Sequence, residues 1–272
     1  MKNTIFPCIW CDNNASEMAK YHVSVFGDGS ILNDNGMVTN SLLSGVKFMY
    51  LNGGPQFEKN PAISFFVRCQ SIEEVDQYSH ELIKEGTALM ELGEYPWAQK
   101  YAWINDKYGV SWQIIFQEGH DATQKFQPSL LFTNEQLGNA QKAIKLYTEV
   151  FPNSEIIATA PYPEQDAQHA GMIMYSSSNI NGMQLVAMDG PGSHHFGFNE
   201  SVSLVVNCKD QAEIDLYWNS LMANGGKEGM CGWLKDPYGV SWQIIPENLG
   251  ALLAKNGPTH MMSMKKIVID EL

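Results

Sequence analysis

The chain alternates short apolar runs with amphipathic segments from its beginning to its end. The apolar run Phe6–Cys11 has the length of a strand. After three polar residues, apolar side chains recur at intervals of three and four, which is the spacing of one helix face: Ala15, Met18, Ala19, Val23 and Phe26. The pattern therefore predicts a strand and then an amphipathic helix.

The same sequence of apolar strand, polar turn and helix returns three more times. New strands are expected from Ile63, Ser129 and Val202, and Ser71 and Asp210 are suited to N-cap the helices that follow two of them. Further strands and Gly-Pro turns come after the first and third helices: Val46–Leu51, Gly54-Pro55, Gly182–Met188 and Gly190-Pro191. The chain thus reads as four modules of the order βαβββ.

One string of eight residues occurs twice. YGVSWQII spans Tyr108–Ile115 and returns unchanged as Tyr238–Ile245, an offset of 238 − 108 = 130 residues. The likeness extends back to SFFVRCQSIEEVDQYSHEL from Ser64 and SLVVNCKDQAEIDLYWNSL from Ser203. Because a period of this size is far longer than a solenoid repeat, it indicates the duplication of a whole domain.

Helices that are followed by runs of antiparallel strands favour an α+β fold over a wound parallel sheet. We predict one domain over residues 1–120, a second over 128–247, and a helical C-terminal tail over 248–272. The polar stretch Gln117–Gln127 is the expected linker between the domains.

Composition narrows the class of protein and its compartment. The net charge of -13, with 17 basic against 30 acidic residues, argues against a nucleic-acid partner. The start of the chain lacks the pattern of a secretory signal, and no apolar run is long enough for a membrane span, so we expect a cytoplasmic protein without a membrane partner. The five cysteines, an odd number, are expected to be reduced, and Cys8-Ile-Trp-Cys11 to be two ordinary buried thiols rather than a zinc or redox pair.

The chain resembles the vicinal oxygen chelate superfamily of glyoxalases, bleomycin-resistance proteins and dioxygenases. Within it, the likeness is to the PhnB-like branch, whose domain carries the name 3-demethylubiquinone-9 3-methyltransferase. The residues that carry it are FPCIWCDNNASEMAKYHVSVFGDGSI, Phe196–Cys208, Cys231–Pro246 and the tail MMSMKKIVIDEL. The resemblance implies two tandem glyoxalase-like domains, each a pair of βαβββ modules that form a curved mixed sheet around a cleft.

The resemblance also implies where a metal would bind. The pattern of the last strand places Gln113 and Gln243 where chelating relatives carry a metal-binding residue. The partner positions fall near Pro7 and Pro128 on the opening strands and at Ser64 and Ser203 on the third long strand. None of these is His or Glu, so we expect no metal and no other cofactor, with a divalent metal as the alternative.

Strand alternation separates the two conspicuous side chains of the repeated string. Trp112 and Trp242 are expected in the core, and Gln113 and Gln243 on the opposite face, in the cleft or in a hydrogen-bonded sheet. Trp103 and Trp233 either line the clefts or pack on the sheet. Because ELGEYPWAQKYAW in the first half is replaced by the shorter NGGKEGMCGW, the two clefts are not expected to bind the same ligand equally.

Three further features have a chemical and a plain interpretation. His194-His195 could supply a general base or be solvated loop residues. Cys231 could be an accessible thiol in the second cleft, but no nearby base lowers its pKa, so we expect it to be inert. The Met-rich tail could bind copper or could pack on a hydrophobic groove, and packing is the interpretation we favour.

Three functions remain open. The first is a cleft that takes a small molecule without a metal, as a binding protein or an enzyme of unknown reaction. The second is a metal-dependent lyase, isomerase or dioxygenase. The third is a methyltransferase on a quinone precursor, which we rank last because the Gly clusters do not sit between a parallel strand and a helix start. A pseudo-dimer of the two halves is expected, and a homodimer of fused chains stays open.

Overall fold

The computed structural model describes residues 4–119 and 123–272, and their elements follow the predicted order βαβββ four times. The first half contains β1 (Ile5–Cys11), α1 (Ala15–Phe26), β2 (Gly29–Asp34), β3 (Val38–Leu43) and β4 (Val46–Asn52), then β5 (Ile63–Arg68), α2 (Ile72–Leu82), β6 (Thr87–Tyr95), β7 (Ala98–Asn105) and β8 (Ser111–Phe116). The second half contains β9 (Phe126–Phe132), η1 (Asn134–Gln136), α3 (Ala140–Val150), β10 (Glu155–Pro161), β11 (Ile173–Ile180) and β12 (Met183–Asp189), then β13 (Val202–Cys208), α4 (Gln211–Met222), β14 (Lys227–Glu228), β15 (Trp233–Lys235) and β16 (Ser241–Pro246).

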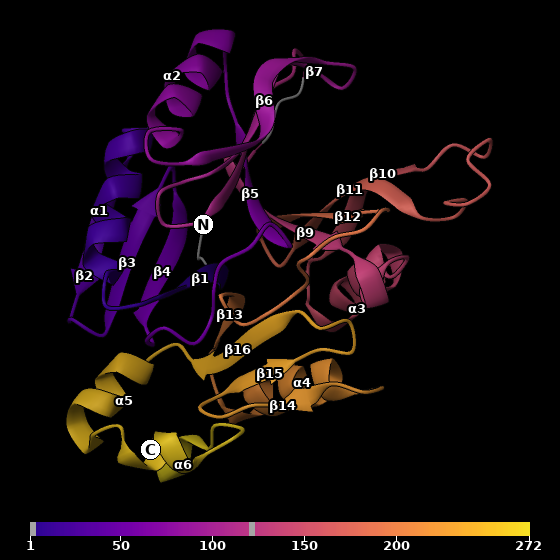
Figure 1. Cartoon of the computed structure of the whole chain (residues 1–272). Helices are drawn as coiled ribbons and strands as arrows, with labels where there is room; N and C mark the ends of the chain where they lie inside the picture. Colours follow the sequence, from indigo (N-terminus) through magenta and orange to yellow (C-terminus); the bar gives the residue numbers. More distant parts are fainter. Residues whose placement is uncertain (1–3, 120–122) are drawn as a thin grey trace.

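The strands form two mixed sheets of eight strands, and each sheet takes one module from each half (Figure 1). Sheet A has the order β14-β15-β16-β13-β1-β4-β3-β2, and sheet B has the order β10-β11-β12-β9-β5-β8-β7-β6. The modules join through antiparallel pairs, β1 with β13 and β5 with β9. The duplicated α+β architecture is confirmed, and the structure adds that the modules of one half lie in different sheets.

The helices cover one face of each sheet, and the hydrophobic core lies on that side. Helix α1 lies beside α2, and α3 contacts α4, so the two helices of each half pack together (Figure 1). Within the first half the sheets meet directly, since the rings of Phe48 on β4 and Phe65 on β5 lie 5.1 Å apart. The opposite side of each sheet, called here its helix-free face, is shared between the halves.

Sequence signals at the helix starts are confirmed. The Ser71 hydroxyl accepts a hydrogen bond from the backbone N–H of Glu74 at 3.3 Å, and Asp210 accepts one from Glu213 at 2.9 Å. Each cap satisfies an amide that has no partner inside the helix. Of the expected linker, Phe126 and Gln127 already belong to β9, and residues 120–122 lie outside the described part of the chain.

A buried carboxylate precedes each copy of the repeated string and organises it. In the second half, Asp236 accepts hydrogen bonds from the backbone of Tyr238 and Val240, from Trp242 Nε1 at 3.0 Å and from the Tyr147 hydroxyl at 2.5 Å. The carboxylate therefore ties the turn, the last strand and helix α3 together.

The first half repeats this arrangement around Asp106. Trp112 Nε1 donates to its carboxylate at 2.9 Å, and His22 Nε2 on α1 lies 2.8 Å from it. His22 thus stands where Tyr147 stands in the second half, and its other ring nitrogen is 3.0 Å from the Tyr50 hydroxyl. This fully buried histidine has a structural role.

The C-terminal tail folds against the second half. It contains α5 (Leu249–Asn256), α6 (Thr259–Ser263) and η2 (Ile269–Glu271). The backbone N–H groups of Cys231 and Gly232 donate to the carbonyls of Met264 and Lys265, and Met264, Ile267 and Leu272 are buried. Of the tail methionines, Met264 lies in this core and Met261 packs against it, whereas Met262 is exposed. None of the described helices has both the length and the apolarity to cross a bilayer.

The buried carboxylate makes a testable contribution to the pH dependence of stability. Burial raises the pKa of Asp236 from 3.8 to about 6, so between these values the folded chain holds a proton that the unfolded chain has released. The free energy of unfolding of the wild type, relative to Asp236→Asn, is therefore expected to fall by up to ~3 kcal/mol as pH rises from about 4 to about 6. Urea unfolding across this range measures it.

Asp215→Asn is the matched control for this experiment. A hydrogen bond from Lys266 lowers the pKa of the Asp215 carboxyl, so its stabilisation is lost as pH falls, which is the opposite sign. A wild-type advantage over Asp236→Asn that is constant across pH would contradict the account.

Candidate functional site on the helix-free face of sheet B

The two conspicuous side chains of the repeated string lie on opposite faces, as predicted. Trp112 and Trp242 are fully buried in the core under the helices. Gln113 pairs with Phe66 of β5 and Trp103 of β7, and these three residues lie on the helix-free face of sheet B. Both tryptophans therefore lie in the core, as strand alternation predicted.

Gln113 sits at the centre of a hydrogen-bonded chain on this face. The Tyr101 hydroxyl donates to Gln113 Oε1 at 2.7 Å, and Gln113 Nε2 donates to Ser64 Oγ at 2.8 Å. Ser129 on β9 lies directly opposite Ser64, and its buried hydroxyl has no hydrogen-bond partner among the described residues. The face thus combines a fixed amide with a hydroxyl whose bonding capacity is unused.

Arg68, the only arginine in the sequence, lies on the same face and is 5% exposed. Its Nη2 donates to the Tyr175 hydroxyl at 2.6 Å, and Nε is 3.4 Å from Gln127 Oε1. Its guanidinium carbon is 5.0 Å from the ring centre of Phe66. No carboxylate lies within ion-pair distance of Arg68 in residues 4–119 or 123–272.

Burial therefore acts on this guanidinium without a compensating anion. Removal from water lowers the pKa of Arg68, although a guanidinium stays charged. A buried charge is costly unless an opposite charge or strong hydrogen bonds offset it. The two neutral oxygen partners leave most of its five N–H donors unbound.

Aromatic and apolar side chains surround the polar groups. The face carries Phe66, Ala98, Tyr101, Ile115 and Val186, with Met90, Tyr95, Trp103, Tyr175 and Met188 packed against them. The hairpin between β6 and β7 adds Trp97, which is half exposed and stacks on Tyr95 at 5.1 Å. Trp103 contributes its ring here, and its Nε1 donates to Ser111 Oγ at 2.8 Å.

The helix-free face of sheet A has the same frame with different side chains. Gln243 Nε2 donates to Ser203 Oγ at 2.9 Å, and Cys8 lies opposite Ser203. Asn207 stands where sheet B has Arg68, and Val205 stands where it has Phe66. Leu249 of α5, which is partly buried, packs against the apolar cluster of this face, formed by Phe6, Cys8, Val205 and Ile245.

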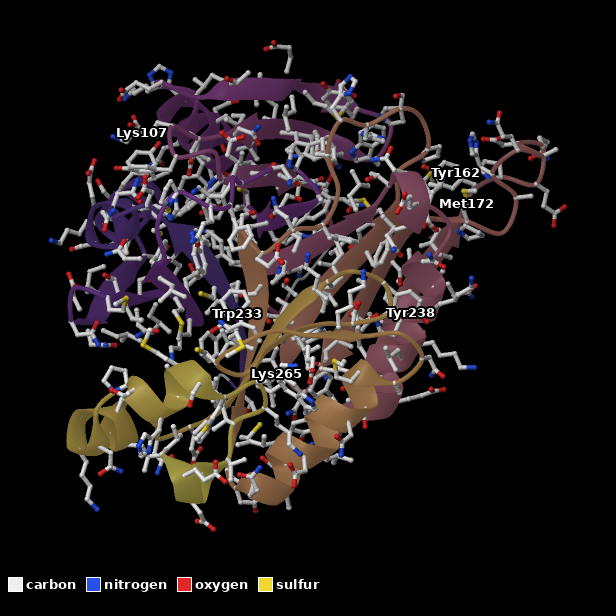
Figure 2. All side chains as sticks on the ribbon, turned by 60° about the horizontal axis from the view of Figure 1, so that its bottom comes forward. Lys107, Tyr162, Met172, Trp233, Tyr238 and Lys265 are labelled. Carbon is white, nitrogen blue, oxygen red and sulfur yellow. The ribbon has the colours of Figure 1, made fainter. Side chains whose placement is uncertain are left out.

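Two more predicted site residues lie in or just before β15, and one of them, Trp233, pairs directly with Gln243. Trp233 is on the helix-free face of sheet A, but its ring packs 5.9 Å from that of Trp10, beside the tail at Lys265 (Figure 2). Cys231 occupies the counterpart position of Tyr101 in a turn with φ of +58°, half-buried, and burial raises the pKa of its thiol.

The histidine pair lies in the loop between β12 and β13. His194 Nε2 is 3.2 Å from the carbonyl of Pro191, and its ring lies 5.0 Å from Phe196. His195 is exposed. Among the described residues, neither histidine makes a hydrogen bond or a ring contact with Gln113, Gln243 or Arg68, so the structure does not bring the pair into this site.

The donor atoms of the two faces do not fit a divalent transition metal. The positions expected near Pro7 and Pro128 are those of Cys8 and Ser129, since the prolines themselves pair with the core residues Leu204 and Phe65. Cys8 and Ser129 point to the helix-free faces, because neighbouring residues of a strand face opposite sides. Ser, Gln and Cys are neutral here, and burial raises the pKa of the Cys8 thiol to about 12.

The described residues also lack any cluster of three His, Cys, Asp or Glu side chains that could hold a metal ion. Both glutamine amides are already engaged with serine hydroxyls. A metal would have to replace these bonds without gaining an anionic ligand.

Comparison with known proteins agrees with the geometry. The model of the 3-demethylubiquinone-9 3-methyltransferase family matches residues 3–115 and again residues 124–245. The chain belongs to this family. It contains two copies of the family domain, and no curated protein matches it.

Solved structures extend the likeness to the glyoxalase fold. Glyoxalase I of Zea mays is 14% identical over 92% of this chain and 95% of its own, with a TM-score of 0.59. A Bacillus subtilis protein provisionally named a dioxygenase is 11% identical over 97% of this chain and 90% of its own, with a TM-score of 0.50. The PhnB protein of Bacillus cereus is 32% identical over 41% of this chain and 98% of its own, with a TM-score of 0.39. The match to glyoxalase I over 92% of the chain shows that the chain, with its two copies of the family domain, has the glyoxalase fold.

Sequence reasoning missed Arg68, Tyr101, Tyr175 and Ser129. A signal existed for Arg68, because it is the only arginine and lies four residues after Ser64, hence on the same strand face. Tyr175 gave no comparable signal. It reaches Arg68 from β11, three strands away in the sheet order, and only the folded sheet brings the two together.

The poor fit of the donor set predicts the metal content of the protein. Purified without chelator, the chain is expected to hold far less than about one divalent ion per half, and added Zn²⁺, Ni²⁺ or Mn²⁺ is expected to leave its Tm unchanged. Elemental analysis and thermal unfolding measure both. A stoichiometric ion, or a metal-induced rise in Tm that Gln113→Ala abolishes, would contradict this.

Proposed function

We propose that this family member is a small-molecule-binding protein whose helix-free face of sheet B takes an organic anion with an aromatic or apolar body. The observation that carries the proposal is the buried guanidinium of Arg68, which has no carboxylate partner in the described part of the chain.

The chemistry of the ligand follows from the unused donors. A carboxylate, phosphate or phosphonate can accept two parallel N–H bonds from one guanidinium, and these charge-assisted bonds are about twice as strong as neutral ones. The Ser129 hydroxyl, which has no partner among the described residues, is a further hydrogen-bonding group on the same face. A net charge of -13 repels anions at long range, so local contacts with Arg68 must provide the affinity.

The body of the ligand is expected to lie along the aromatic side chains. Tyr95 and Trp97 form a stacked pair at the open end of the face, and Tyr101 contacts both rings edge-on at 5.5 and 6.0 Å. Flat apolar walls with a few convergent polar groups are typical of small-molecule sites. Trp97 is half exposed, so a ring that stacks there gains buried area.

The second half supports a single site of this kind per chain. Sheet A offers Asn207 in place of Arg68, and Leu249 of the tail packs on its helix-free face. We therefore expect one anion per chain, although the domain is present twice. Whether the bound anion is then converted is a separate question.

Arg68→Met tests the proposal. Benzoate and phenylphosphonate are expected to bind the wild type with one site in calorimetric titrations, to raise its Tm, and to lose at least about tenfold in affinity in the variant. Because the variant removes a buried charge without an ion partner, its free energy of unfolding without ligand is expected to be unchanged or up to ~2 kcal/mol higher. Arg68→Lys keeps the positive charge but loses the forked guanidinium. Its affinity for both anions is expected to lie between those of the wild type and Arg68→Met.

Lys47→Met is the matched control, because Lys47 lies over the Phe6 ring on the helix-free face of sheet A. This substitution removes a half-buried cation from the other sheet and is expected to leave the affinities for benzoate and phenylphosphonate unchanged. Benzamide, the neutral analogue, should bind much more weakly than benzoate. Equal binding of both anions to the wild type and Arg68→Met would overturn the proposal, and a tight titration with S-adenosylmethionine would favour the methyl transfer named by the family.

A further inference from the structure

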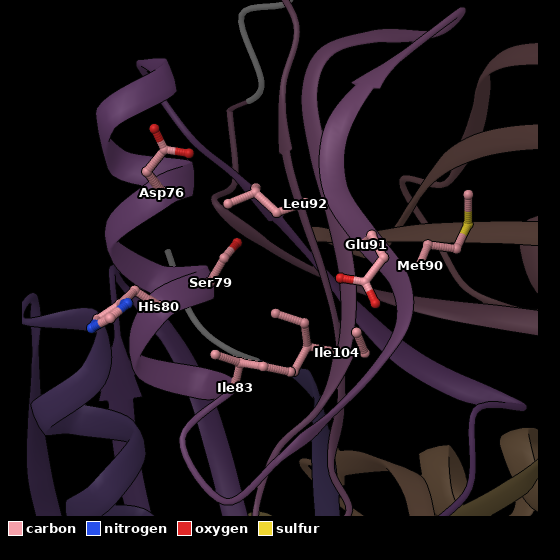
Figure 3. Close-up of a pocket in the computed structure, with 9 residues that line it drawn as sticks. Asp76, Ser79, His80, Ile83, Met90, Glu91, Leu92 and Ile104 are labelled. Carbon is pink, nitrogen blue, oxygen red and sulfur yellow. The ribbon is translucent and has the colours of Figure 1, made fainter.

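A cavity of about 490 Å³ lies on the other side of sheet B, between α2 and strands β6 and β7 (Figure 3). Its walls are partly apolar, from Ile83, Leu92 and Ile104. Ile104 belongs to the core side of the sheet, so the cavity is separated from Arg68 by the sheet itself. Its volume is in the range of small-molecule sites.

The helix wall of the cavity carries a buried hydroxyl without a partner. Ser79 is 3% exposed, and its Oγ has no hydrogen-bond partner among the described residues. Figure 3 shows the hydroxyl directed from α2 into the space in front of Ile104 and Leu92. A serine inside a helix usually satisfies its hydroxyl on a carbonyl one turn earlier, and leaving it unbound is costly.

The second half fills the same place with protein. Alignment of the two halves puts Trp218 of α4 at the position of Ser79, and this indole is 6% exposed in the core. The tail crosses α4 there, with Ile267 buried and Lys266 paired with Asp215, the counterpart of Asp76. The cavity therefore lies where the first half has a serine for a tryptophan.

The charges at the cavity select among possible ligands. Asp76 and Glu91 line it, and Lys100 lies 3.1 Å from Asp76 Oδ1. Glu91 is exposed and has no ion pair within the described ranges. Figure 3 shows its carboxylate on the strand wall, facing the helix. One uncompensated carboxylate, one free hydroxyl acceptor and an apolar floor fit an ammonium group on a hydrocarbon chain.

We propose that the cavity between α2 and β6 is a second binding site, which takes a small aliphatic amine. The alkyl chain lies against Ile83, Leu92 and Ile104, and the ammonium group donates to Ser79 Oγ and to the Glu91 carboxylate. The site is independent of the anion site, because it uses the opposite side of the sheet.

Titration of the full chain with n-octylamine tests the site. The wild type and Arg68→Met are expected to bind n-octylamine. Ser79→Trp, which places an indole where α4 has one, is expected to lose at least about tenfold in affinity. Gln77→Trp is the matched control, because it places the same indole on the exposed side of α2. Leu92→Trp fills the cavity from the strand wall, so the site can be tested even if Ser79→Trp fails to fold.

The head group is tested with n-octanol and octanoate. Glu91→Gln is expected to weaken octylamine severalfold and to leave octanol unchanged, while octanoate should bind weakest. Octylamine binding that survives both Ser79→Trp and Leu92→Trp overturns the site, and equal affinity for the three octyl compounds overturns the assignment to amines. Neither result bears on benzoate binding at Arg68.

Discussion

A carboxylate buried beneath each copy of the repeated string holds the rest of its half in place. Asp106 and Asp236 accept backbone N–H groups of the following turn and the indole N–H of the tryptophan six residues on. Each also reaches the first helix of its half, through His22 or Tyr147. Because the turn and the indole are fixed, strand alternation directs the neighbouring glutamine side chain to the opposite face. Its amide therefore lies at the centre of the helix-free face.

The duplicated chain contains this carboxylate arrangement twice, and each sheet combines modules from different halves. The two helix-free faces nevertheless carry different side chains. Sheet B kept an arginine, three tyrosines and an exposed indole on its helix-free side, whereas sheet A carries small and apolar groups that α5 covers. The helix side shows the same inequality, since α4 of the sheet A module has Trp218 and the tail where α2 of the sheet B module has Ser79. One half became packed where the other remained accessible.

The sequence predicted the module order, the N-caps at Ser71 and Asp210 and the burial of Trp112, because these depend on local periodicity and capping chemistry. The sequence did not predict that each sheet combines modules from both halves, since nothing in β1 identifies β13 rather than β8 as its neighbour. That Cys8 and Ser129 face the helix-free sides, and the neighbouring prolines do not, likewise follows from register. Arg68 went unnoticed because its role depends on a tyrosine more than 100 residues away.

The antiparallel joint between β1 and β13 also has a consequence for biosynthesis. The strand that begins at Ile5 finds its neighbour only when Val202–Cys208 has left the ribosome, so one edge of the first module stays bare while most of the chain is made. Exposed strand edges recruit other strands, and pairings of such sequence separation form slowly. The N-terminal half can therefore pair with other strands until the fourth module has been synthesised. The two halves must complete their folding as one cooperative unit.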